Sequence, residues 1–122
     1  MTDIITREDV RKVLIKWQND LLSAKQVHDW AETRYMNSQF ECDDWEGEEE
    51  WSVTNEVLAK LDTLNMNLTT ADDVSIFMAF LSTPIGAFDT GYQHMEQALK
   101  SIDIEKRKEQ LSDIDFYRPF CR

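Results

Sequence analysis

An acidic segment in the middle of the chain constrains the fold more than any other feature. Seven of the ten residues from 41 to 50 are Asp or Glu, none is basic, and Trp45 and Trp51 belong to the same stretch. Burying an unpaired carboxylate costs on the order of several kcal/mol. The segment is therefore expected at the surface, with the core built from the segments on either side of it.

Those flanking segments have the pattern of amphipathic helices. Three Gly and two Pro among 122 residues leave little turn material for many short strands. Apolar residues recur at three- and four-residue spacing, and the first such stripe is Val10, Val13, Leu14, Trp17 and Leu21. Further helices are predicted over 23–35, 53–64, 74–81, 88–102 and 103–111. We predict an all-α single domain over 1–122, a bundle of about five to six helices with an acidic loop between the second and the third.

Capping residues support these boundaries. Each predicted helix except the fifth follows a side chain that can accept a hydrogen bond from the first helical turn. These residues are Thr6, Ser23, Ser52, Thr70 and Asp103. The aromatic tail over 116–122 is expected to pack against the body.

The excess charge is confined to the middle of the chain. Residues 35–99 contain one basic and thirteen acidic side chains, both flanks are near neutral, and the net charge is -11. This charge disfavours nucleic acid and anionic membranes as direct partners and attracts a basic protein. The sequence shows neither a signal peptide nor an apolar run of transmembrane length, and its two cysteines lie far apart. We therefore expect a cytoplasmic protein.

Catalysis and cofactor binding have little support in the sequence. No zinc-protease motif, Gly-rich phosphate loop or nucleophile elbow occurs. His28 and Glu32 are one helical turn apart, a spacing that chance often produces on a polar face. A calcium loop with Gly47 in sixth place would put Cys42 first and Val53 twelfth, where oxygen ligands are needed. We expect no enzyme, no cofactor and no specific metal site, with a weak nonspecific cation site in the acidic segment as an alternative.

The acidic segment is typical of a surface that binds a basic partner. Tryptophan is enriched at binding hot spots, and carboxylates steer a cationic protein towards the surface. The predicted partner-binding residues are Asp43, Asp44, Trp45, Glu46, Glu48, Glu49, Glu50, Trp51, Asp72 and Asp73. Within this set Trp45 is assigned to the partner and Trp51 to the core, and Asp72 and Asp73 also cap the fourth helix. The alternative is a solvated loop that both tryptophans pin to the core.

Several stretches resemble a group of small acidic bacterial proteins. They are Asn55-Glu56-Val57-Leu58, Leu61-Asp62, residues 64–70, residues 80–84 and Tyr117-Arg118-Pro119-Phe120-Cys121. Members of that group are all-helical where known and look like immunity proteins of the contact-dependent growth inhibition type. The resemblance covers most of the chain, mainly at core and cap positions. It implies a protein that binds and neutralises a cognate toxin domain, an RNase or a DNase. The alternative is a helical adaptor or regulatory protein for another basic partner.

Overall fold

The computed structural model describes residues 2–48 and 50–122. Within these ranges the chain forms six α-helices: α1 (Arg7–Gln18), α2 (Ala24–Arg34), α3 (Val53–Asp62), α4 (Val74–Leu81), α5 (Phe88–Lys100) and α6 (Ile104–Leu111). Two short 3-10 helices, η1 (Ala71–Asp73) and η2 (Arg118–Phe120), precede α4 and end the chain. The prediction of a mainly helical chain is confirmed.

The acidic segment is not a plain loop. It contains β2 (Phe40–Cys42), β3 (Trp45–Glu46) and β4 (Trp51–Ser52). β2 pairs in parallel with β1 (Asp3–Ile5), and β3 pairs antiparallel with β4. The prediction of an all-α bundle with an acidic loop is therefore confirmed only as a mainly helical chain, because strands of two or three residues are too short to show an alternating pattern in the sequence.

Side-chain caps fix most helix starts. All five predicted caps accept a hydrogen bond from a backbone N–H two or three residues later, at Thr6, Ser23, Ser52, Thr70 and Asp103. The end of the first helix differs most from the prediction: α1 ends at Gln18, and Asp20 takes the left-handed conformation with φ 61°. The chain turns away there, so Leu21 is exposed instead of buried.

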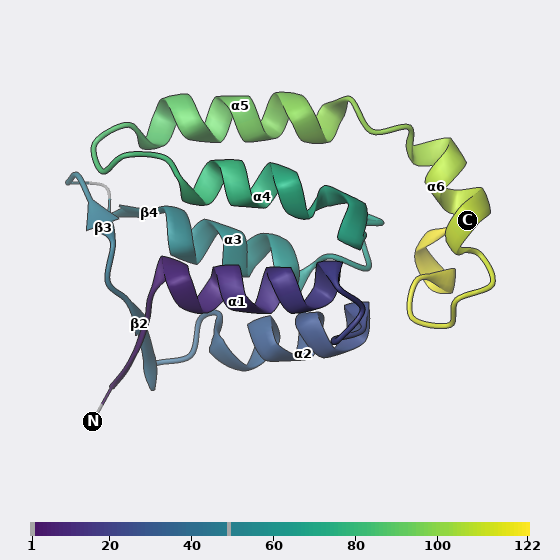
Figure 1. Ribbon diagram of the computed structural model, residues 1–122, viewed down its shortest axis with the longest axis horizontal. Coiled ribbons are helices and arrows are strands. Elements are labelled where there is room, and N and C mark those ends of the chain that lie inside the picture. The colour runs from purple at the N-terminus through teal and green to yellow at the C-terminus, as the bar shows by residue number, and fades with distance from the viewer. Residues whose placement is uncertain (1, 49) are drawn as a thin grey trace.

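Helices α1 to α5 lie side by side, and consecutive helices run in opposite directions (Figure 1). α5 packs on α4, α4 packs on α1 and α3, and α2 packs on the same two helices. The core lies between these layers, with Val57, Leu61, Phe77 and Leu81 fully buried. The longest helix, α5, has 13 residues, whereas crossing a bilayer takes about 20. No helix among the described residues has the length and hydropathy of a membrane span.

The two ends of the bundle are closed differently (Figure 1). The short strands close the end at which α1, α3 and α5 begin, and α6 with the C-terminal tail closes the other. Tyr117 of the tail is buried, and its hydroxyl donates to the carbonyl oxygen of Thr69 at 2.6 Å. The tail therefore packs on the body, as the sequence predicts.

Candidate partner-binding site

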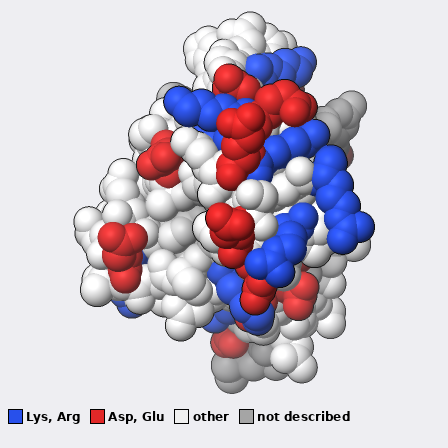
Figure 2. Space-filling model, turned by 90° about the vertical axis from the view of Figure 1, so that its right-hand side faces the viewer, with Lys and Arg blue, Asp and Glu red and all other residues white. Residues whose placement is uncertain are grey.

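The two ends also differ in charge. Figure 2 shows Lys and Arg side chains interleaved with Asp and Glu on the end that holds α6 and the tail. Ion pairs at that end include Lys108 with Glu105 at 3.3 Å and Arg118 with Asp115 at 2.8 Å. The acidic segment lies at the opposite end, where helix N-termini present partial positive charge to its carboxylates.

Asp44 is buried, although the sequence places it on a binding surface; its exposed fraction is 8%. Its Oδ2 accepts hydrogen bonds from Arg7 Nε at 2.9 Å and from the Thr54 backbone N–H at 3.1 Å. Its Oδ1 accepts from the hydroxyl of Ser52, the cap residue of α3. Burial alone would raise the pKa of Asp44, but the hydrogen bonds from Ser52, Thr54 and Arg7 outweigh it, so the pKa is lowered. This carboxylate stabilises the fold and is not available to a partner.

Arg7 explains why burial of Asp44 is tolerated. The two residues are 37 positions apart, so the counter-charge is invisible to local sequence reasoning. The Arg7 guanidinium also donates to the carbonyl oxygens of Leu81 and Thr83, and Arg11 donates to Leu81 at 2.8 Å. Arg7 thereby links the acidic segment to the C-terminus of α4, where the helix dipole favours a cation.

Glu46 and Trp51 also make contacts within the chain. The residue before α5 is Ala87, which has no side-chain cap to offer. Glu46 Oε1 supplies one, accepting from the backbone N–H groups of Gly86 at 3.0 Å and Phe88 at 3.2 Å. The Trp51 ring stacks on Phe88 with ring centroids 5.1 Å apart, while 42% of the residue remains exposed. The β3–β4 hairpin is thus docked on the start of α5, but Trp51 lies outside the buried core to which the sequence assigned it.

Asp72 and Asp73 do not extend the acidic surface. They form part of η1, at the end of the bundle that holds α6. Asp73 is buried and makes a bidentate ion pair with Arg107 of α6, with both N–O distances at 2.7 Å. Asp73 accepts from the Thr70 backbone N–H at the start of η1, but α4 has no side-chain cap, so the predicted capping of the fourth helix by Asp72 and Asp73 is wrong. Asp72 is exposed.

Among the residues of the segment that the structure describes, four carboxylates are exposed. They are Glu41, Asp43, Glu48 and Glu50, which we call the exposed carboxylates; Asp44 and Glu46 are called the structural carboxylates. Glu49, also in the predicted set, lies outside the described residues. Trp45 of β3 is 43% exposed beside this group. The structure therefore divides the predicted site into a part that holds the fold together and a part that faces solvent.

Trp45 borders a groove of about 600 Å³ between the C-terminal end of α2, β2 and the start of α3. Apolar atoms dominate its lining, which includes Ile5, Met36, Phe40, Cys42 and Leu58. Glu41 and Glu50 also line it, and Met36 is 86% exposed at its rim. The predicted site omits Met36, Phe40 and Glu41, because only the folded chain brings them to one groove with Ile5, Trp45 and Leu58.

The groove has no obvious chemistry of its own. Burial raises the pKa of the Cys42 thiol to about 11, and the charge of Asp44 adds to this, so the thiol stays protonated at neutral pH. Arg34 is held on the wall by stacking, with its guanidinium 4.5 Å from the Trp30 ring centroid, and by donating to the Trp30 carbonyl oxygen at 2.9 Å. A protonated thiol is a poor nucleophile, and an apolar floor beside carboxylates is suited to binding.

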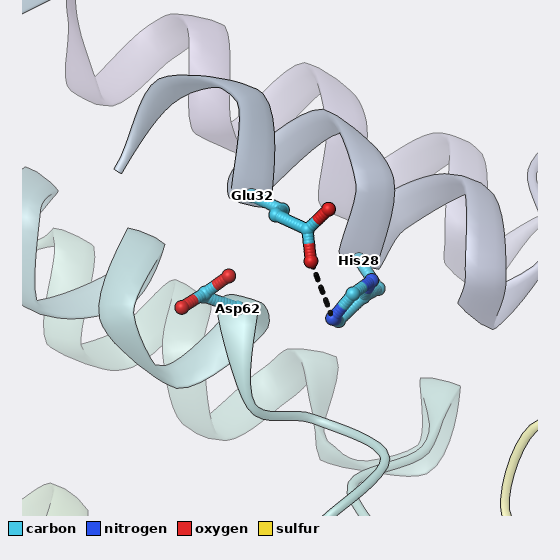
Figure 3. Close-up of side chains that lie close together, drawn as sticks. All are labelled: His28, Glu32 and Asp62. Carbon is cyan, nitrogen blue, oxygen red and sulfur yellow. Dashed lines mark ion pairs between the residues drawn. The ribbon is translucent and has the colours of Figure 1, made fainter. Parts of the chain in front are cut away.

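A second cluster of polar side chains lies apart from the groove. His28 and Glu32 of α2 face Asp62 at the end of α3 (Figure 3). One potential ligand atom from each residue lies within 4.8 Å of the other two. These are the residues in the described part of the chain whose types and spacing suit a metal ion.

Comparison with known proteins supplies no family: no protein-family model, curated protein or solved structure matches this chain.

Proposed function

We propose that this protein binds a basic toxin domain through the groove beside Trp45 and neutralises it. The observation that carries the proposal is the position of a half-exposed tryptophan over an apolar groove bordered by exposed carboxylates. Tryptophan and methionine at such a site supply desolvated contact area, and carboxylates around them select a cationic partner.

The charge of this part of the chain indicates that the partner is basic. Residues 35–99 contain a single basic side chain, Lys60, and it forms an ion pair with Glu96 at 2.8 Å. A cationic protein approaching the exposed carboxylates meets attraction from this part of the chain, which raises its association rate.

A nuclease is the toxin class that fits this surface best. Its active site must hold a polyanion, so the cleft is basic. Glu41, Asp43, Glu48 and Glu50 could occupy such a cleft in place of phosphates, with Trp45 as the apolar anchor. The resemblance of the sequence to immunity proteins supports the same function, and such an inhibitor would act in the cytoplasm of the cell that makes the toxin.

The test is co-expression with the product of the adjacent gene, followed by co-purification and a nuclease assay. We expect a complex, loss of nuclease activity in the complex, and protection of cells that express both proteins. Trp45→Ala should weaken the complex without changing the fold. A complex with a basic protein that has no toxic activity would favour the adaptor function instead, and absence of both binding and protection would refute the immunity function.

A further inference from the structure

We propose that His28, Glu32 and Asp62 form a binding site for a divalent cation of the Zn²⁺ type. The three side chains come from two packed helices and converge at the side of α2 that faces the end of α3 (Figure 3). One nitrogen and two carboxylate oxygens are a ligand set that zinc accepts, with water completing the coordination. Two carboxylates also balance the charge of a divalent ion.

The imidazole of His28 is already oriented for this role. Its Nδ1 lies 3.1 Å from Asp29 Oδ1, and the other oxygen of Asp29 accepts from Lys25 Nζ at 2.7 Å. The ring also packs edge-on against Phe116 of the tail, with centroids 5.3 Å apart. A carboxylate on one ring nitrogen is the arrangement that holds metal-binding histidines in place. It leaves Nε2 directed at Glu32 (Figure 3).

The distances allow closure around an ion. His28 Nε2 and Glu32 Oε2 are 3.7 Å apart, and two ligands of a tetrahedral zinc lie about 3.3 Å apart. The potential ligand atoms of the three residues lie within 4.8 Å of one another. Rotation of the two carboxylate side chains can shorten these distances, because the Glu32 side chain is 65% exposed and Asp62 is only partly buried. The small shift required falls on the two carboxylates, while the histidine stays fixed.

The nitrogen ligand decides between classes of cation. Mg²⁺ and Ca²⁺ prefer oxygen ligands alone, whereas imidazole suits zinc and its neighbours among the transition metals. A zinc ion here would tie α2 to α3 at a distance from the groove, so this inference stands or falls separately from the proposed function.

The experiment is a zinc titration of the metal-free, untagged full chain by calorimetry, because a polyhistidine tag would bind the same ion. We expect one ion per chain, little competition from millimolar Mg²⁺, and an upward shift of the melting temperature on adding zinc. With Co²⁺ as the probe, visible absorption bands of low-symmetry coordination should appear.

Matched variants locate the site. His28→Ala should weaken zinc binding by at least about tenfold, and Asp29→Ala, which removes the hydrogen-bond partner of the ring, by about tenfold. His94→Ala removes an exposed histidine of α5 and should leave affinity unchanged. The double variant Glu32→Gln/Asp62→Asn provides the same test if His28→Ala fails to fold. No saturable binding by the wild type, or equal binding by the wild type and the double variant, would overturn the proposal.

Discussion

Asp43 and Asp44 are neighbours in the sequence, yet they belong to different parts of the molecule. Asp44 is buried against Arg7 and the start of α3, while Asp43 faces solvent. The same contrast separates Glu46, which caps α5, from the exposed Glu48 and Glu50. Side chains on adjacent residues of an extended segment point to opposite sides, which separates Asp43 from Asp44. Glu48 and Glu50 differ from Glu46 because they lie in the turn between β3 and β4.

The largest expected effect is on stability, at Asp44. Asp44→Asn leaves Arg7 without its buried counter-charge. Because both carboxylate oxygens of Asp44 accept hydrogen bonds, the NH₂ group of the asparagine would face a hydrogen-bond donor in either orientation of the amide. We expect a loss of about 3 kcal/mol in the free energy of unfolding, measured by urea denaturation. Asp43→Asn is the matched control and should change it by less than about 0.5 kcal/mol. Equal effects would abolish the distinction between structural and exposed carboxylates.

The second prediction separates the tryptophans. Trp45→Ala should raise the dissociation rate of the toxin complex by an amount equivalent to about 2 kcal/mol, since the residue contributes exposed apolar surface to the groove. Trp51→Ala removes the stacking on Phe88 and should lower the stability of the free protein. Surface plasmon resonance and thermal denaturation measure the two quantities. Unchanged dissociation after Trp45→Ala would exclude the groove from the interface.

The third prediction concerns association. Reversing the charges of Asp43, Glu48 and Glu50 to Lys should slow binding of a basic toxin about tenfold at low salt and flatten the salt dependence. Stopped-flow measurements over a range of ionic strength test this. Reversal of Glu105, Glu109 and Asp113 at the α6 end changes the net charge equally and should slow binding much less. If both triple variants behave alike, overall charge and not the exposed carboxylates controls the encounter.

The smallest effect is the pH dependence of stability. The folded-state pKa of Asp44 lies below its ordinary value, so its contribution is complete above the unfolded-state pKa of about 4 and is lost as the pH falls through the folded-state pKa. The stability difference between wild type and Asp44→Asn should therefore shrink below about pH 4. Urea denaturation of both proteins at each pH measures this difference. A difference that stays constant down to pH 2 would mean that the charge of Asp44 does not matter to the fold.

The sequence predicts most of the helical scaffold because the signals are local. A cap such as Ser23 and the apolar stripe that follows it lie within one or two helical turns, so spacing alone identifies the element. The features that the sequence misplaces have two origins, the end of a helix and contacts across the chain. Leu21 is exposed because α1 ends one turn earlier than its apolar stripe suggests, and the strands exist because β1, near the N-terminus, pairs with residues 40–42.

The candidate site is predictable only in outline, because its contacts join residues that lie far apart in the sequence. Composition identifies the acidic segment and its tryptophans, but the buried state of Asp44 depends on Arg7, and the role of Glu46 depends on the uncapped start of α5. The sequence adds Asp72 and Asp73 to the acidic surface, but the fold places them at the other end of the bundle, beside α6.

What the sequence by itself determined is therefore the set of helices, their caps and the concentration of negative charge in the middle of the chain. Tertiary structure alone decided which carboxylates are free and which hold helix ends. The physical reason is that burying a charge is favourable only where a partner and hydrogen-bond donors meet it, and in this protein those groups come from residues distant in the sequence.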